Sequence, residues 1–248
     1  MNLEPLRFPT PDGEGDGVVV FADRPAPLVI LTMDAFGVRP TLTAIAERFA
    51  ALGYVVAVPN LYWRAGPFEP FEPRTTFGDP SERARVQGLM GAVTPAVVAA
   101  DTDALIAALH ADPRVVAGPV GLLGYCMGGR QAFYLASHLG DRAAAMASIH
   151  GGGLVRADSA SPHLRANRIR ARCYFAVADK DASCTAADCV TLGGALTAAG
   201  VRHEIELYPG ALHGFAMDDM SVYDAPSSER HWARVGSLFA EAFQTEGF

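Results

Sequence analysis

The sequence predicts an α/β protein built on a mostly parallel, doubly wound sheet with helices on both faces. Six short apolar runs alternate with segments of helical periodicity, as strands do when helices connect them. Most of these runs are too continuously apolar to leave one face in water, so helices must cover both sides of the sheet. With 248 residues, 50% of them hydrophobic, the chain can bury one large core. We expect a single domain over residues 1–248, although the length alone would permit two.

The expected elements follow one another in a regular order. The predicted strands are residues 28–33, 55–59, 120–125, 143–150, 173–178 and 203–208. Thr41 is placed to cap a helix that stops before Gly53. Further helices are expected over residues 95–110 and from Ser227 onward, each with an apolar stripe. The stretch 63–80, rich in Pro, Gly and Phe, predicts a long irregular loop, where pocket walls are often built.

Charge and cysteine content argue against several classes of partner. The net charge of −7 and the lack of a basic cluster argue against nucleic acid. The first residues lack a basic start followed by an apolar run, and no later apolar stretch has the length of a membrane span. We therefore expect a cytoplasmic protein with no membrane partner. In that reducing compartment the four cysteines should be free thiols.

One cysteine lies in a pattern that carries chemistry. A buried strand runs directly into GYCMG, with Cys126 between Gly124 and Gly128, and then into a helix near Arg130. This is the nucleophile-elbow pattern with cysteine in place of serine. The glycines are needed because the turn is sharp and a side chain would collide with neighbouring backbone. The turn aims the thiol at a helix N-terminus, which favours thiolate and offers the backbone N–H of Met127 to an oxyanion.

A structural interpretation competes with the catalytic one. A buried cysteine beside packing glycines explains the pentapeptide by itself equally well. The strand–turn–helix context favours catalysis, as does the sequence downstream. In this fold an acid and then a histidine follow the nucleophile along the chain, each at the carboxyl end of a strand. Asp179 and Asp181 follow the strand 173–178, and His213 follows the strand 203–208 after a Pro-Gly turn. Physical reasoning alone does not separate the two aspartates, and a loop histidine is often only solvated.

Together these motifs resemble the dienelactone hydrolase family, the carboxymethylenebutenolidases and their relatives. The similarity extends from the strand at residue 28 to the final helix, and it implies the α/β-hydrolase fold. The segments that carry it are MDAFG at 33–37, GYVVAVPNLY at 53–62, GYCMGG at 124–129, DKD at 179–181 and YPGALHGF at 208–215.

The resemblance also implies roles for particular residues. It assigns the acid to Asp181 and a second oxyanion donor to the backbone N–H of Ala35. It places thiol modulation on Asp34, and it places substrate binding on Phe36 and on Arg85, the first of two arginines that hold a substrate carboxylate.

The chain departs from the family pattern at two of these positions. Asp34 replaces the usual glutamate and is one methylene shorter, so a simple turn residue is an equal alternative. Met217 stands where the second arginine is expected, which removes a bidentate partner for a carboxylate. The substrate is therefore neutral or bound in another pose. Arg85 is equally consistent with a surface helix.

The sequence thus predicts a hydrolase that cleaves a small-molecule ester or lactone through a thioester on Cys126. A general carboxylesterase for small neutral esters and a catalytically silent binding module are the alternatives. A glutamine amidotransferase would have glutamate at position 215, which is phenylalanine here. We expect a monomer or a small homo-oligomer.

Other local signals carry no separate function. The HGGG sequence at 150–153 resembles a lipase oxyanion loop but follows the nucleophile instead of preceding it, so we interpret it as a turn beside the pocket. HEIE at 203–206 lacks the second histidine of a zinc helix, and Cys184 and Cys189 are not spaced as a zinc pair. No nucleotide-binding fingerprint occurs. We therefore expect no metal and no cofactor.

Overall fold

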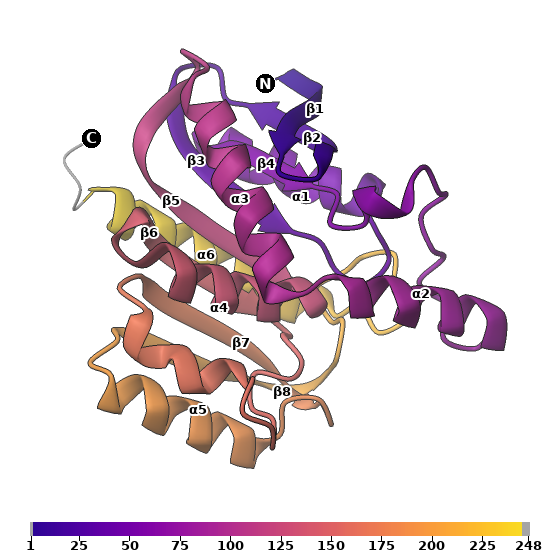
Figure 1. Cartoon of the computed structure of the whole chain (residues 1–248). Helices are drawn as coiled ribbons and strands as arrows, with labels where there is room; N and C mark the ends of the chain where they lie inside the picture. The colour runs from indigo at the N-terminus through magenta and orange to yellow at the C-terminus, as the bar shows by residue number, and fades with distance from the viewer. Residues whose placement is uncertain (1, 245–248) are drawn as a thin grey trace.

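The computed structural model describes residues 2–244 and shows one eight-stranded sheet between two layers of helices (Figure 1). The strand order is β1-β2-β4-β3-β5-β6-β7-β8. The strands β3 to β8 pair in parallel where they are neighbours, and the β1–β2 hairpin joins β4 antiparallel. The bounds are β1 Asn2–Thr10, β2 Gly13–Phe21, β3 Ala26–Thr32, β4 Val55–Pro59, β5 Val115–Tyr125, β6 Ala143–Ile149, β7 Arg172–Lys180 and β8 His203–Leu212. This architecture is the α/β-hydrolase fold that the sequence predicts.

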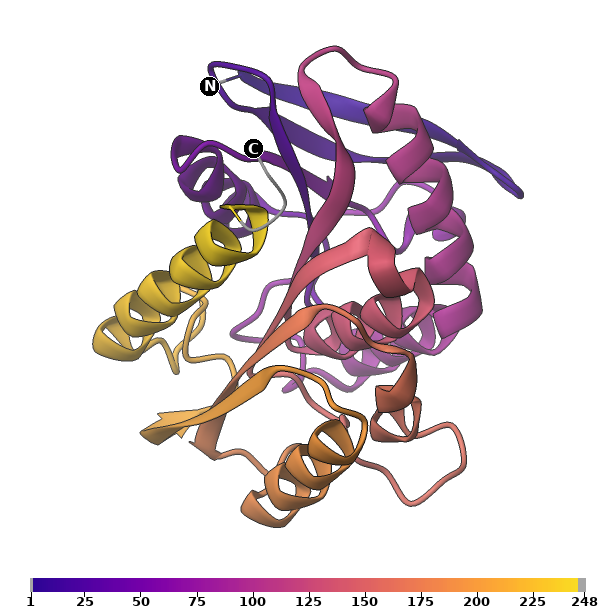
Figure 2. The ribbon, with the colours of Figure 1, turned by 90° about the vertical axis from the view of Figure 1, so that its left-hand side faces the viewer.

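Helices cover both faces of the sheet, as Figure 2 shows in a view along its edge. On one side lie α1 and α6, and on the other lie α3, α4 and α5. The bounds are α1 Pro40–Ala51, α2 Pro80–Ala92, α3 Pro95–His110, α4 Met127–Leu139, α5 Ala186–Ala198 and α6 Ala225–Gln244, with short 3-10 turns at Trp63–Ala65, Gly140–Arg142 and Pro162–Arg168. Because both faces are covered, the central strands are buried along almost their whole length, which explains their continuous apolar sequences.

The aromatic stripe of α6 closes one face of the core. Phe239 is fully buried, and its ring centroid lies 5.9 Å from that of Phe49 on α1 and 5.8 Å from that of Tyr54. Val235 and Phe243 continue the same stripe at helical spacing. The stripe read from the sequence is therefore core, as expected.

One element was missed, and one expected helix cap is corrected. The N-terminal β1–β2 hairpin was not predicted, because two prolines and two charges in β1 weaken the strand pattern, and an edge strand tolerates both. Thr41 does not cap α1: Arg39 is the N-cap, Pro40 is the first helical residue, and the Thr41 hydroxyl donates to Asp218 at 2.9 Å. Gly53, with a φ of 94°, does follow the end of α1.

The loop predicted over 63–80 is present apart from one 3-10 turn and the start of α2 at Pro80. Helix α4 begins at Met127, directly after the elbow. Within residues 2–244 no single helix has the length and apolar character of a membrane span, although α2 and α3, bent by 68° where they meet, satisfy those two criteria as a pair.

Candidate active site

A pocket of about 510 Å³ opens at the carboxyl ends of the central strands. Cys126 and His213 face it together with Asp34, Ala35 and Asp181. The rest of its wall is largely apolar, and the large apolar side chains in it are Phe36, Phe77, Met90, Leu212, Met220 and Val222. Parallel strands bring their carboxyl ends to one edge of the sheet, which is why residues distant in sequence meet here.

The turn that presents Cys126 is strained and sterically closed. Cys126 has a φ of 54° and a ψ of −116°, a conformation that side chains rarely adopt. A Cβ at Gly124 would lie 2.1 Å from the carbonyl oxygen of Gly128, and one at Gly128 would lie 2.1 Å from that of Thr32. The structure therefore confirms that both glycines are required, and the sharp turn places the thiol at the N-terminus of α4.

The thiol, the imidazole and one carboxylate form a continuous chain. His213 Nε2 lies 3.0 Å from Cys126 Sγ, and His213 Nδ1 lies 2.6 Å from Asp181 Oδ2. Because Nδ1 donates to the carboxylate, Nε2 is free to exchange a proton with sulfur. Asp179, the competing aspartate, instead accepts a hydrogen bond from the backbone N–H of Gly210 at 3.0 Å and so supports the turn before the histidine.

Ser183 completes the surroundings of the carboxylate and was not identified from the sequence. Its hydroxyl donates to Asp181 Oδ1 at 2.6 Å and its backbone N–H donates to the same oxygen at 2.8 Å. The hydroxyl also lies 3.3 Å from His213 Nδ1. The spacing Asp181-Ala-Ser183 is that of an Asx turn, which is the signal that could have revealed it.

The electrostatics of the chain favour a protonated His213. Burial lowers the pKa of His213, but the negative charge of the Cys126 thiolate and the hydrogen bond to Asp181 outweigh it and raise this pKa to about 10. Burial alone would raise the pKa of Asp181, yet the hydrogen bonds from His213 and Ser183 hold it below its ordinary value. A charged imidazole between a cysteine sulfur and a carboxylate suits acyl transfer.

The HGGG turn lies beside the pocket, as the sequence analysis expects. His150 is 1% exposed with a φ of 39°, and its ring centroid is 5.2 Å from that of His213. Burial and the neighbouring His213 hold the pKa of His150 well below its usual range, so His150 packs against His213 as a neutral ring.

The structure brings some of the remaining predicted residues into the pocket and leaves others outside. Phe36 and Ala35 line the pocket, and Met127 starts the helix behind the thiol. Arg85 is not among the lining residues: its guanidinium pairs with Glu82 at 2.7 Å and stacks on Phe71. Met217, at the second arginine position, is fully buried.

Asp34 faces the pocket, but its hydrogen bonds lead elsewhere. Both carboxylate oxygens accept from the guanidinium of Arg39, at 2.7 and 2.9 Å, and Oδ1 also accepts the backbone N–H of Phe36 at 3.0 Å. Burial raises the pKa of Asp34, and the charge of Arg39 opposes that rise. Arg39 was not identified from the sequence, because its second partner, Asp219, is 180 residues away in the chain.

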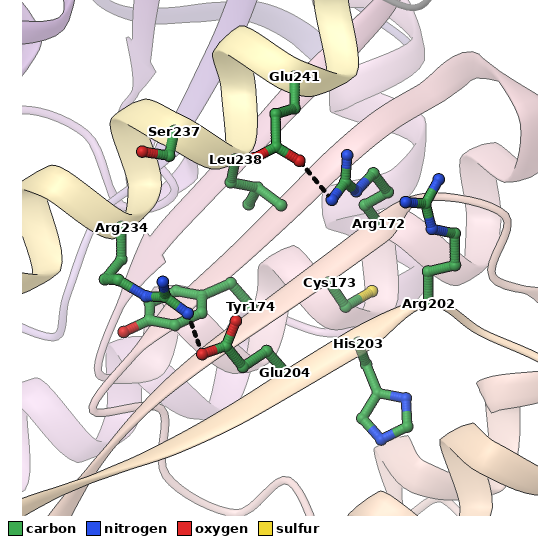
Figure 3. Close-up of a pocket in the computed structure, with 10 residues that line it drawn as sticks. All are labelled: Arg172, Cys173, Tyr174, Arg202, His203, Glu204, Arg234, Ser237, Leu238 and Glu241. Carbon is green, nitrogen blue, oxygen red and sulfur yellow. Dashed lines mark hydrogen bonds and ion pairs between the residues drawn. The ribbon is translucent and has the colours of Figure 1, made fainter.

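A second pocket, between α6 and the starts of β7 and β8, also contains a cysteine and a histidine (Figure 3). The side chains of Cys173 and His203 do not point toward each other there. Cys173 Sγ donates to a backbone carbonyl at 3.5 Å, and His203 Nδ1 lies 2.8 Å from another. Burial raises the pKa of the Cys173 thiol, which makes it unreactive. This pocket therefore lacks a nucleophile–base pair. Within residues 2–244, no three His, Cys, Asp or Glu side chains are grouped to hold a metal ion.

Comparison with known proteins shows the family. A model of the dienelactone hydrolase family matches residues 16–243. The chain belongs to the dienelactone hydrolase family. The relative named "Putative carboxymethylenebutenolidase" of Synechocystis sp. is 33% identical over 217 residues, which cover 86% of this chain and 85% of the relative. A "Carboxymethylenebutenolidase" of a Pseudomonas species is 34% identical over 111 residues, which cover 45% of this chain and 44% of that one.

Solved structures lead to the same family. The crystal structure named "Putative Dienelactone Hydrolase" from Klebsiella pneumoniae superposes with a TM-score of 0.81 at 26% identity, over 96% of this chain and 98% of that one. As a dienelactone hydrolase family member, the protein is a carboxylic ester hydrolase that acts on bonds of the ester or lactone type. The alternative of a silent binding module is thereby disfavoured.

Proposed function

We propose that the protein hydrolyses small, uncharged esters or lactones through a thioester on Cys126. The observation that carries the proposal is the chain from Sγ through the imidazole to Asp181, with contacts of 3.0 and 2.6 Å, which lines a pocket with a largely apolar wall. A thiolate beside a charged imidazole is the arrangement that cysteine acyl transfer requires.

The reaction follows from these contacts in two halves. In the first half, the Cys126 thiolate adds to the substrate carbonyl carbon, and the carbonyl oxygen takes the negative charge. The backbone N–H groups of Met127 and Ala35 are proposed to bind that oxygen, each contributing about 3–4 kcal/mol to the transition state. Collapse of the intermediate breaks the C–O bond, and the departing alkoxide takes the proton from His213 Nε2.

In the second half, water hydrolyses the thioester. The now neutral His213 removes a proton from the attacking water, and the new tetrahedral intermediate expels the Cys126 thiolate as the C–S bond breaks. Asp181 stabilises the imidazolium that forms again. The acid product leaves, and the thiolate–imidazolium pair is restored.

Within residues 2–244, the pocket lacks the paired arginines that would bind a substrate carboxylate, which favours a neutral substrate. Arg85 lies outside it, and position 217 is a buried methionine. Arg39 has its N–H groups committed to Asp34, Asp219 and Gly37. Lys180 is the only lysine or arginine among the described residues that line the pocket. No paired arginines therefore face the thiol to hold a substrate carboxylate.

Two further expectations stay predictions. A cytoplasmic location agrees with the four free cysteines, since a reducing compartment keeps thiols reduced. A monomer or a small homo-oligomer remains the expected state. An amidotransferase has no support, because Phe215 is a fully buried ring stacked on Tyr208 at 4.9 Å.

The test is a substrate panel assayed with the wild-type protein, with Cys126→Ala and with Cys189→Ala, which removes a half-buried thiol outside the pocket lining. The panel contains 4-nitrophenyl acetate, 4-nitrophenyl butyrate, a neutral lactone and an anionic dienelactone. We expect the wild type and Cys189→Ala to prefer the neutral substrates, and Cys126→Ala to lose about 10³-fold or more in kcat. Full activity in Cys126→Ala would overturn the mechanism, and a preference for the anionic lactone would overturn the substrate class.

A further inference from the structure

The turn that follows β3 forms one wall of the site. Residues 34–36, here called the oxyanion turn, contain the proposed donor Ala35 and the pocket residue Phe36. The carboxylate of Asp34 accepts the N–H of Phe36 at 3.0 Å, and the buried Tyr62 hydroxyl donates to the carbonyl of Ala35 at 3.0 Å. The geometry of the turn thus depends on where the Asp34 carboxylate is held.

Arg39 holds that carboxylate from the N-cap of α1. Its side chain is 5% exposed, and Nη1 and Nη2 donate to the two oxygens of Asp34 at 2.7 and 2.9 Å. The guanidinium carbon also lies 5.4 Å from the ring centroid of Phe36. One buried cation therefore contacts both ends of the oxyanion turn. A planar fork is the group suited to such paired bonds.

The other edge of the same guanidinium holds the segment that carries the base. Nε and Nη2 donate to the two oxygens of Asp219, at 2.5 and 3.1 Å. Asp219 belongs to residues 213–220, here called the histidine segment, which follows β8 and contains His213. The N–H groups of Phe215, Met217 and Met220 each donate to the carbonyl three residues earlier, so the segment is a run of tight turns.

We propose that Arg39 is a positioning residue that fixes the oxyanion turn against the histidine segment, so that the donor from Ala35 and the base His213 keep one relative placement. The proposal rests on the proposed thioester chemistry. In this role Asp34 is a link between Arg39 and the turn, since both of its oxygens are engaged by the guanidinium. A shift of about 1 Å in a catalytic group can lower the rate about 100-fold. Loss of the Arg39 link can therefore have a large effect on kcat.

The test separates the oxyanion turn from the thiol itself. Ester hydrolysis needs the oxyanion donors, whereas alkylation by iodoacetamide needs only the reactive sulfur: the S–C bond forms, the C–I bond breaks, and no oxyanion develops. Both rates are measured for wild type, Arg39→Lys and Asp219→Asn, with alkylation followed on the Cys126 peptide by mass spectrometry. Arg48→Gln is the matched control, because Arg48 lies on α1, the helix that Arg39 caps, and the change removes its exposed bidentate pair with Glu229 of α6.

Lysine keeps the charge of Arg39 but cannot form two paired contacts at once. We expect Arg39→Lys to lower kcat for a neutral ester about tenfold or more, with a smaller change in KM and an alkylation rate within about twofold of wild type. Asp219→Asn should also lower kcat, but by less than Arg39→Lys does. Arg48→Gln should leave the rates of hydrolysis and alkylation unchanged.

A kcat within about twofold of wild type in both Arg39→Lys and Asp219→Asn would overturn the proposal. So would alkylation that falls in parallel with hydrolysis, because Arg39 would then act on the thiol or on folding in general. If thermal melting shows that Arg39→Lys does not fold, Asp219→Asn alone decides, since it keeps the Arg39–Asp34 pair and loses only charge. Failure of the proposed function is distinguishable: there the wild type itself hydrolyses no ester, or Cys126→Ala retains its activity.

Discussion

At the scale of single residues, the side chains of Asp181, His213 and Cys126 form a row of interacting polar groups. Asp181 orients and charges His213, and His213 in turn faces the sulfur of Cys126. The sequence predicted these three because an elbow and two strand ends constrain them strongly. It did not predict Ser183 or Arg39, since a serine two residues after an aspartate is common and the partners of Arg39 meet only in the folded chain. Local motifs indicate the proposed reacting groups, and tertiary contacts decide what supports them.

The first residue-scale prediction concerns the titration of His213. In wild type its imidazole should titrate near pH 10, and Cys126→Ala should lower this pKa because it removes the negative sulfur. A raised folded pKa adds stability that is fully present below about pH 6.5 and is lost as the pH rises through about 10. NMR of the imidazole nitrogens measures the pKa of His213 in the wild type and in Cys126→Ala. His231, whose pKa burial lowers to about 3, serves as the internal control. A wild-type His213 that titrates near 6.5 would contradict the assignment.

The second residue-scale prediction concerns Ser183, whose hydroxyl donates a hydrogen bond to Asp181, the carboxylate that contacts His213. Ser183→Ala removes one hydrogen bond to a charged group, typically worth about 1.5–3 kcal/mol. If part of that loss appears in the transition state, kcat/KM should fall about tenfold. Ser183→Thr keeps the hydroxyl and should retain most activity. Steady-state kinetics on a neutral ester give the comparison, and equal rates for the alanine and threonine variants would remove Ser183 from the machinery.

At the scale of elements, the elbow shows how far a local pattern can be trusted. Glycine spacing predicted the turn because the close approach of β3, β5 and α4 leaves no room for a Cβ. The β1–β2 hairpin escaped prediction because β1 is the edge strand of the sheet, where pairing does not require apolar residues. The start of α1 was misplaced by two residues, since Pro40 at the first helical position is a stronger signal than a nearby threonine.

Two glycine substitutions test the elbow. Gly128→Ala would place a Cβ 2.1 Å from the backbone oxygen of Thr32, so the turn must shift. We expect it to lower the free energy of unfolding by about 2 kcal/mol or more and to abolish most esterase activity. Gly88→Ala, in the exposed part of α2 with nothing within 4 Å, should instead add about 0.5–1 kcal/mol and keep activity. Chemical denaturation measures both, and equal stabilities would contradict the steric explanation.

At the scale of the whole molecule, the sheet and its two helical layers bring Asp181, His213 and Cys126, which follow β7, β8 and β5, to one edge. This arrangement was predictable, because continuous apolar strands fix a covered parallel sheet and the loops after them then converge. The shape of the pocket was not, because Phe77 and Met220 come from irregular segments and Met90 comes from α2, whose sequence shows no apolar stripe. Their placement depends on tertiary packing, which the hydrophobic periodicity of the sequence does not predict.

The core that holds this arrangement is testable at Phe239, where α6 meets α1 and the sheet. Phe239→Ala removes a fully buried ring in contact with three other aromatic rings and should cost about 3–5 kcal/mol of the free energy of unfolding. Leu52→Ala, at a side chain that is 58% exposed, should change it by about 0.5 kcal/mol or less. Urea denaturation of the two variants gives the contrast. Comparable losses would show that α6 contributes little to the core.

The central claim is that Cys126 carries the acyl group during ester hydrolysis. The most direct measurement is rapid acid quenching of the wild-type protein with 4-nitrophenyl butyrate, followed by peptide mass spectrometry. We expect one butyryl group on the peptide that contains Cys126, and none on that peptide in Cys126→Ala. Substrate turnover by the wild type without any acyl group on Cys126, and at an equal rate by Cys126→Ala, would contradict the claim.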